Sequence, residues 1–69
     1  MAVTIYTKTG CPYCSSAKEA FRKNNVEYVE INLTNNPEKI QELVKLAGVR
    51  KVPVIVEGGN VTVGFNGGG

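Results

Sequence analysis

Apolar and polar residues along the first half of the chain follow the patterns of a strand, a helix and a second strand. Residues 3–7 are rich in β-branched and aromatic side chains and predict a buried strand. From Pro12 to about Asn24, apolar residues recur three and four positions apart, which predicts an amphipathic helix. Alternating apolar and polar residues then predict another strand over residues 26–33.

The second half of the chain predicts one more helix and a hairpin. An asparagine, a proline and an acid at residues 36–38 are typical of a helix start, and Gly48 is a typical stop. Between them, apolar residues at helical spacing predict a core-facing stripe, made of Ile40, Leu43, Val44 and Ala47. Residues 52–56 and 61–65 predict two strands, and the Gly-Gly-Asn sequence between them favours a β-hairpin.

These elements define an α/β fold class with the order β-α-β-α-β-β. We expect a single domain over residues 1–69, because the chain is too short for two. The first strand, helix and strand predict a right-handed parallel crossover, and the hairpin adds antiparallel strands to give a mixed four-stranded sheet. Three of the five aromatic residues are expected to be buried or half-buried in this fold, namely Tyr6, Phe21 and Tyr28. Residues 66–69 are rich in glycine and predict no element.

Composition excludes several classes of function. A net charge of +2 without a basic stripe gives no reason to expect a nucleic-acid partner. The absence of histidine excludes serine–histidine hydrolysis and histidine metal centres. Neither a membrane-spanning apolar run nor a signal peptide is evident. We expect no membrane partner, and we further expect a monomer that acts in the cytoplasm.

The two cysteines, Cys11 and Cys14, are the residues with chemistry. A bridge between them would close too small a loop to stabilise the fold much, so a chemical role is favoured. Cys11 falls at the predicted start of a helix, where backbone N–H groups and the helix dipole stabilise a thiolate, and Lys8 adds positive charge. Cys14 follows one turn later. We predict that Cys11 is a nucleophile and Cys14 a buried resolving thiol.

With these motifs in order, the sequence resembles the glutaredoxin family over essentially its whole length. The resemblance rests on Tyr6-Thr7-Lys8, on Cys-Pro-Tyr-Cys at residues 11–14, on Val52-Pro53 and on Gly64-Phe65. It implies a thioredoxin fold in which Val52-Pro53 is a cis peptide beside the cysteines. It also implies a thiol–disulfide oxidoreductase that uses glutathione as co-substrate, reduces protein disulfides and glutathione mixed disulfides, and needs no metal.

The resemblance further implies a glutathione groove. In the family, the backbone of the residue at Val52 pairs with the bound substrate beside Pro53. Lys8 would lie near the glycine carboxylate, Tyr13 along the flank, and Arg50 could assist. Backbone groups at the end of the last strand would complete the groove, with the site residues there being Gly64, Phe65 and Asn66.

This sequence departs from the family pattern in two places. Many glutaredoxins carry an aspartate after the last strand that holds the γ-glutamyl amine, whereas residues 63–67 here contain no acid. The Gly64-Phe65 variant is similar to small redoxins that are recharged by thioredoxin reductase, which is therefore an alternative electron donor. Relatives also continue into a third helix that covers the sheet, so the final helix is expected to be absent or truncated in these residues.

Other interpretations of the two cysteines stay open. They could be a core thiol and an incidental neighbour, since free cysteines are often buried as small hydrophobes. A zinc site within one chain is disfavoured, because two thiolates fill only half of a tetrahedral site. A cluster shared by two subunits, with glutathione as additional ligand, would make the protein an iron–sulfur carrier and is the alternative from a different functional class.

Overall fold

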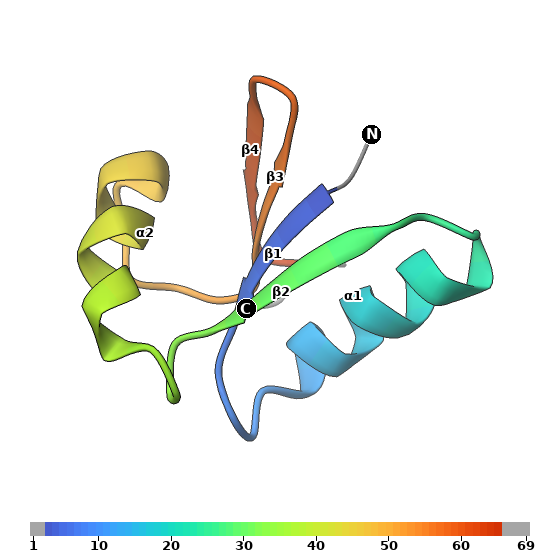
Figure 1. Cartoon of the computed structure of the whole chain (residues 1–69), viewed down its shortest axis with the longest axis horizontal. Coiled ribbons are helices and arrows are strands. Elements are labelled where there is room, and N and C mark those ends of the chain that lie inside the picture. The colour runs from blue at the N-terminus through green and yellow to red at the C-terminus, as the bar shows by residue number, and fades with distance from the viewer. Residues whose placement is uncertain (1–2, 66–69) are drawn as a thin grey trace.

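The computed structural model describes residues 3–65 and contains four strands, two α-helices and one short 3₁₀ helix (Figure 1). The elements are β1 (Val3–Thr7), α1 (Pro12–Lys23), β2 (Tyr28–Asn32), η1 (Pro37–Lys39), α2 (Ile40–Ala47), β3 (Val54–Glu57) and β4 (Asn60–Val63). No helix within this part of the chain is long and apolar enough to cross a membrane.

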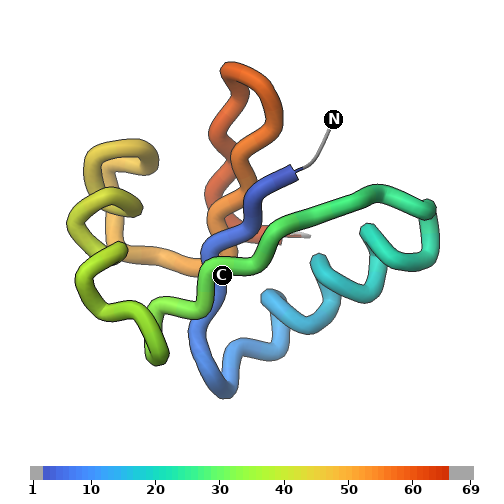
Figure 2. The backbone as a smooth tube through the Cα atoms, in the orientation of Figure 1, coloured from blue at the N-terminus to red at the C-terminus, as the bar shows by residue number. Residues whose placement is uncertain are grey.

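The strands form one mixed sheet in the order β2-β1-β3-β4. β1 and β2 are parallel, with Val3 opposite Tyr28, and they are joined through α1. β3 is antiparallel to both β1 and β4. The predicted parallel pairing of the first two strands, the hairpin and the four-stranded mixed sheet are therefore confirmed. Figure 2 shows the chain passing from β1 through α1 back to β2, so that the β1–α1 turn lies at one end of the sheet.

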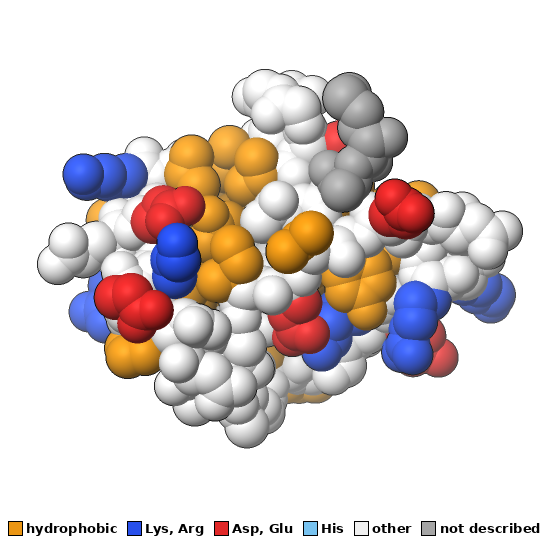
Figure 3. Space-filling view, in the orientation of Figure 1, with side chains coloured by type: hydrophobic (Ala, Val, Ile, Leu, Met, Phe, Trp, Pro, Cys, Tyr) orange, Lys and Arg blue, Asp and Glu red, His pale blue; other side chains and the backbone are white. Residues whose placement is uncertain are grey.

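The helices lie on opposite sides of the strands (Figure 1). Because successive side chains of a strand point to opposite faces, β1 contributes to both layers of the core. On one face Val3 and Ile5 are buried, and α1 adds the buried Ala17. On the other face Tyr6 packs in a cluster that includes Leu43 of α2. Figure 3 shows apolar side chains reaching the surface between α2 and the sheet, with charged side chains around them.

Several element boundaries differ from the sequence-based expectation. The strand predicted over residues 26–33 is shortened to Tyr28–Asn32, because the amide of Val26 donates to the carbonyl of Phe21 at 2.8 Å and so continues the turn after α1. The next predicted strand begins at Val54 instead of residue 52, and it extends to Glu57. β4, in contrast, begins and ends earlier than predicted, at Asn60–Val63, so residues 64 and 65 follow the strand.

The segment before α2 does not begin as an ordinary α-helix. Residues 37–39 form a 3₁₀ turn, and the side chain of Asn36 donates to the carbonyl of Asn32 at 3.0 Å instead of capping the helix. The α-helical stripe then lies as predicted, with Leu43 buried. Gly48 ends the helix at a φ of 76°, a left-handed conformation that glycine adopts with little cost.

Candidate active site

The turn between β1 and α1 places Cys11 at the N-cap of α1, the position whose side chain can satisfy free backbone N–H groups. Gly10 precedes it with a φ of 83°, which lets the chain turn sharply from the strand into the helix. Pro12 then occupies the first turn of the helix, where its missing N–H leaves no hydrogen bond unmade.

The Cys11 sulfur accepts a hydrogen bond from a helix-terminal amide. The backbone N–H of Cys14 donates to Cys11 Sγ at 3.3 Å. A hydrogen bond of this kind, together with the positive end of the helix dipole, favours negative charge on the sulfur. Cys11 is only 7% exposed, but it lines two surface depressions. A disulfide sulfur can therefore approach it from solvent.

The second thiol is protected from ionisation. Cys14 is 2% exposed, and both cysteines are free thiols. Burial, a hydrogen bond with the Cys11 side chain and the nearby Cys11 charge together raise the pKa of Cys14 to about 12. A backbone hydrogen bond at Lys8 and the charge of Lys18 act in the opposite direction and only partly offset this. Cys14 thus rests as a thiol beside Cys11, as expected of a resolving cysteine.

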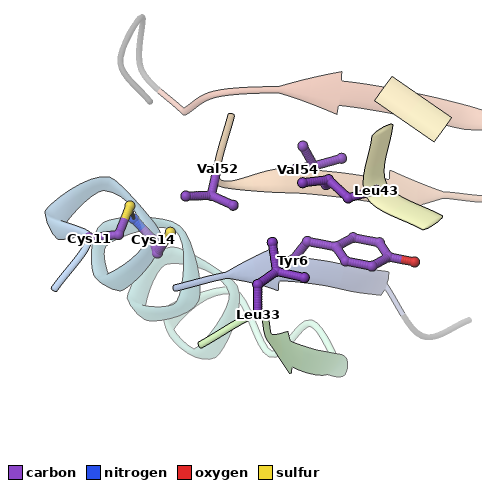
Figure 4. Packing of buried hydrophobic residues seen from close by; sticks show 7 residues of the cluster. All are labelled: Tyr6, Cys11, Cys14, Leu33, Leu43, Val52 and Val54. Carbon is purple, nitrogen blue, oxygen red and sulfur yellow. Dashed lines mark hydrogen bonds between the residues drawn. The ribbon is translucent and has the colours of Figure 1, made fainter. Parts of the chain in front are cut away.

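The segment that precedes β3 lies against the cysteines. The Val52–Pro53 peptide bond is cis, as the resemblance implies. Val52 is buried and belongs to the same apolar cluster as both cysteines. In Figure 4 the Val52 side chain lies on the cysteine side of the cluster, whereas the ring of Tyr6 extends away from them. The amide of Gly64 donates to the carbonyl of Pro53 at 2.7 Å and ties this segment to the end of β4.

A groove of about 300 Å³ opens beside Cys11. Three basic side chains and no acidic ones line it, so its surface is positively charged and suits a ligand with carboxylates. The lining residues are Lys8, Gly10, Cys11, Pro12, Tyr13, Arg50, Lys51 and Val52.

The groove brings together four of the predicted binding residues but not all of them. Lys8, Tyr13, Arg50 and Val52 line it with Cys11, and the predicted Pro53 is adjacent in the chain. Gly64 and Phe65 are half-buried residues that do not line the groove, and the structure connects Gly64 to it only through Pro53. The predicted Asn66 lies outside the described residues. Lys51 was not predicted, and only its place next to Arg50 in the sequence could have suggested it.

The sequence also did not indicate a charged cluster that shares a depression with both cysteines. A depression of about 620 Å³ is lined by both cysteines and by Lys18 and Glu30. Lys18 Nζ lies 3.0 Å from Glu30 Oε2, and the buried Thr7 hydroxyl donates to the same oxygen at 2.7 Å. The Thr7 hydrogen bond holds the pKa of Glu30 below its ordinary value, with the Lys18 contact acting in the same direction. In the sequence, Lys18 and Glu30 did not differ from ordinary solvent-exposed charged residues.

Together, these features are the ones that thiol–disulfide exchange requires. The Cys11 sulfur lies at a helix N-terminus and lines an open groove, and the pKa of the buried Cys14 thiol close to it is raised. This arrangement allows one thiol to attack a disulfide and the other to release the product. The fold and the site thus define the class of dithiol redox proteins.

Comparison with known proteins narrows the class to a family. The glutaredoxin family profile matches residues 3–62. The chain is 34% identical over 64 residues to the "uncharacterized glutaredoxin-like 8.6 kDa protein in rubredoxin operon" of Clostridium pasteurianum, a match that covers 93% of this chain and 85% of that protein. It is 40% identical over 53 residues to glutaredoxin 3 of Escherichia coli K12, covering 77% of this chain and 64% of the relative, just under two thirds.

Solved structures agree with the sequence matches. The glutaredoxin from Archaeoglobus fulgidus superposes with a TM-score of 0.83 at 25% identity, covering 93% of this chain and 75% of that one. The glutaredoxin-like NrdH-redoxin from Escherichia coli gives a TM-score of 0.82 at 32% identity, covering 96% and 86%. The chain therefore belongs to the glutaredoxin family, whose members are thiol–disulfide oxidoreductases with a thioredoxin fold.

Proposed function

We propose that this chain reduces protein disulfides and glutathione mixed disulfides through Cys11 and Cys14, with glutathione as its electron donor. The Cys11 thiolate attacks one sulfur of the substrate disulfide, which forms a mixed disulfide and releases the other substrate sulfur as a thiolate. Cys14 then loses its proton and attacks Cys11, which releases the second substrate sulfur. The substrate gains two electrons, and the protein is left with a Cys11–Cys14 disulfide.

Two molecules of glutathione complete the cycle. The first attacks the Cys11–Cys14 disulfide to give a mixed disulfide with Cys11, and the second releases glutathione disulfide. For a glutathione mixed disulfide as substrate, Cys14 is not needed, because a further glutathione resolves the intermediate at Cys11 directly.

The positively charged groove beside Cys11 is the observation that supports glutathione. Glutathione has two carboxylates, and Lys8 and Arg50 line the groove within the same pocket as the Cys11 sulfur. A buckwheat glutaredoxin solved as a glutathione complex superposes on this chain with a TM-score of 0.76 at 29% identity, over 90% of this chain and 59% of that one. The positive charge of the groove beside Cys11 therefore suits the carboxylates of glutathione.

A coupled assay with two cysteine variants tests this function. Reduction of a glutathione mixed disulfide is followed through NADPH oxidation with glutathione and glutathione reductase. The parent and Cys14→Ser should turn over, and Cys11→Ser should not, because only Cys11 faces the groove. With a protein disulfide as substrate, Cys14→Ser should lose most of its activity. Turnover by Cys11→Ser at the parent rate would refute the mechanism.

A second candidate donor is thioredoxin reductase. The NrdH-redoxin from Escherichia coli, described as having a thioredoxin-like activity profile, is among the similar structures, and its chain is covered to 86%. No acid occurs in residues 63–67 to hold the glutathione amine. The same assay with thioredoxin reductase replacing glutathione and its reductase separates the two donors. Higher turnover with thioredoxin reductase would favour this candidate over the glutathione-dependent one.

Thiols stay reduced in the cytoplasm, which is where we propose that this dithiol protein acts. Fractionation of the source cells with an antibody to the chain tests the location. Recovery in an extracytoplasmic fraction would contradict it.

A further inference from the structure

A second pocket adjoins the groove beside Cys11. It has a volume of about 280 Å³, and its inner wall is made of apolar side chains, with Leu33 and Leu43 buried and Ile40 half-buried. Lys8, Arg50 and Val52 line both depressions, so the two are continuous. We call this second pocket the apolar pocket, and below the two depressions are the apolar pocket and the groove beside Cys11.

Glutathione does not explain the apolar pocket. Its cysteine is flanked by a γ-glutamyl group, which is polar, and by glycine, which has no side chain. Neither flanking residue can fill a cavity walled by leucine and isoleucine side chains. The tripeptide would use the charged rim at Lys8 and Arg50 and leave the apolar pocket unfilled.

An extended peptide can fill both depressions. Among residues 3–65, no backbone hydrogen bond occupies the peptide groups of Val52, which lies outside β3. The backbone of an extended substrate peptide can therefore form hydrogen bonds with the peptide groups of Val52. With the substrate cysteine at Cys11, a neighbouring side chain would reach the apolar pocket past the residues that the two depressions share, namely Lys8, Arg50 and Val52. The basic rim then favours a carboxylate next to that side chain.

We propose that the apolar pocket is a side-chain subsite, through which this protein selects protein disulfides whose reactive cysteine has an apolar neighbour and a nearby carboxylate. The inference rests on the proposed disulfide reduction and adds the substrate class to it. The reaction itself is unchanged, because two electrons pass from the Cys11–Cys14 dithiol to the peptide disulfide, which gives two peptide thiols and the intramolecular disulfide.

Single-turnover reduction of short peptides tests the subsite without any electron donor. The substrates are disulfide-linked homodimers of blocked peptides that contain cysteine and one aspartate, with leucine before the cysteine, leucine after it, or glycine on both sides. The fully reduced protein is mixed with each peptide, the reaction is stopped with acid at intervals, and the reduced peptide is separated and quantified, because the total number of thiols does not change. One of the leucine peptides should be reduced about tenfold faster than the glycine peptide, in the range typical for a hydrophobic subsite.

Variants of exposed residues show where the preference arises. Thr34 is exposed and lines the apolar pocket, so Thr34→Trp should fill the pocket and abolish the advantage of leucine. The glycine peptide, which leaves the apolar pocket empty, is the internal reference, so the ratio of the leucine rate to the glycine rate is compared between Thr34→Trp and the parent. Thr62→Trp is the matched control, since Thr62 is exposed on β4 and lines neither depression. It should retain the full advantage of leucine.

Charge reversals test the carboxylate preference. Arg50 lines both depressions and Lys51 only the groove beside Cys11. Arg50→Glu should reverse the preference for an aspartate peptide over its asparagine counterpart, and Lys51→Glu should change it less. Equal rates for leucine and glycine peptides would overturn the subsite but leave disulfide reduction standing. Failure of the parent to reduce any peptide would overturn both.

Discussion

Replacing Cys11 with alanine removes two of the three causes that raise the pKa of Cys14 and leaves the largest, its burial. In the parent, the pKa of Cys14 is raised from 9.0 to about 12. Each pKa unit changes the thiolate fraction tenfold, so at pH 7 about one Cys14 in 100,000 is ionised. In Cys11→Ala the pKa of Cys14 should fall, because the hydrogen bond and the negative charge of Cys11 are gone, but it should stay above 9.0.

The rate of alkylation by iodoacetamide measures this ionisation, because only the thiolate reacts. In Cys11→Ala, the rate at Cys14 should rise about tenfold for each pH unit from pH 7 and continue to rise beyond pH 9. Limited access lowers the rate equally at every pH, so the pH at which the rate levels off reports the pKa alone. At pH 7 the parent should take up a single label, on Cys11, as seen by peptide mass spectrometry. A plateau at or below pH 9 in Cys11→Ala would refute the argument from burial.

Three further predictions concern the fold. The lowered pKa of Glu30 stabilises the protein above the ordinary pKa of 4.5, and this stabilisation is lost as the pH falls through the lower, folded-state pKa. Glu30→Gln should therefore reduce the urea midpoint at pH 7, and this effect should shrink as the pH is lowered below 4.5, so a loss that is the same at every pH would contradict it. Leu43→Ala should lower the free energy of unfolding by about 2–5 kcal/mol, because Leu43 is only 1% exposed. A loss under about 1 kcal/mol would contradict the tight packing of the Leu43 side chain. Gly48→Ala should lower the free energy of unfolding by about 1–2 kcal/mol in the same urea assay. The cause is the φ of 76° alone, since no atom lies within 4 Å of the added carbon. An unchanged midpoint would rule out backbone strain at this position.

Local patterns in the sequence were sufficient to predict the order of elements, the hairpin and the place of the cysteines. The strand ends were not predictable, because they depend on hydrogen bonds to distant residues. β4 ends where Gly64, at a φ of 86°, turns its amide toward the Pro53 carbonyl. β3 begins only after the cis peptide at Val52–Pro53, a geometry that the family resemblance implied and residue propensity did not.

The cysteine pair could be predicted as a site, because its spacing and its place at a helix start have a direct chemical meaning. The walls of the apolar pocket could not, since Leu33 and Leu43 look like any other core residues until the fold brings them beside Val52. The Lys18–Glu30 pair was also unpredictable, because it joins a helix and a strand that the sequence separates.

Reaction of single-cysteine variants with glutathione disulfide tests the role of Cys11 most directly. Cys14→Ser and Cys11→Ser are each incubated at pH 7, and the intact mass is followed over time. Cys14→Ser should gain one glutathione rapidly, because its remaining thiol is at the helix N-terminus and lines the groove. Cys11→Ser should stay almost unmodified, because Cys14 is buried and its pKa is raised. Equal rates of modification in the two variants would contradict the assignment of Cys11 as the nucleophile.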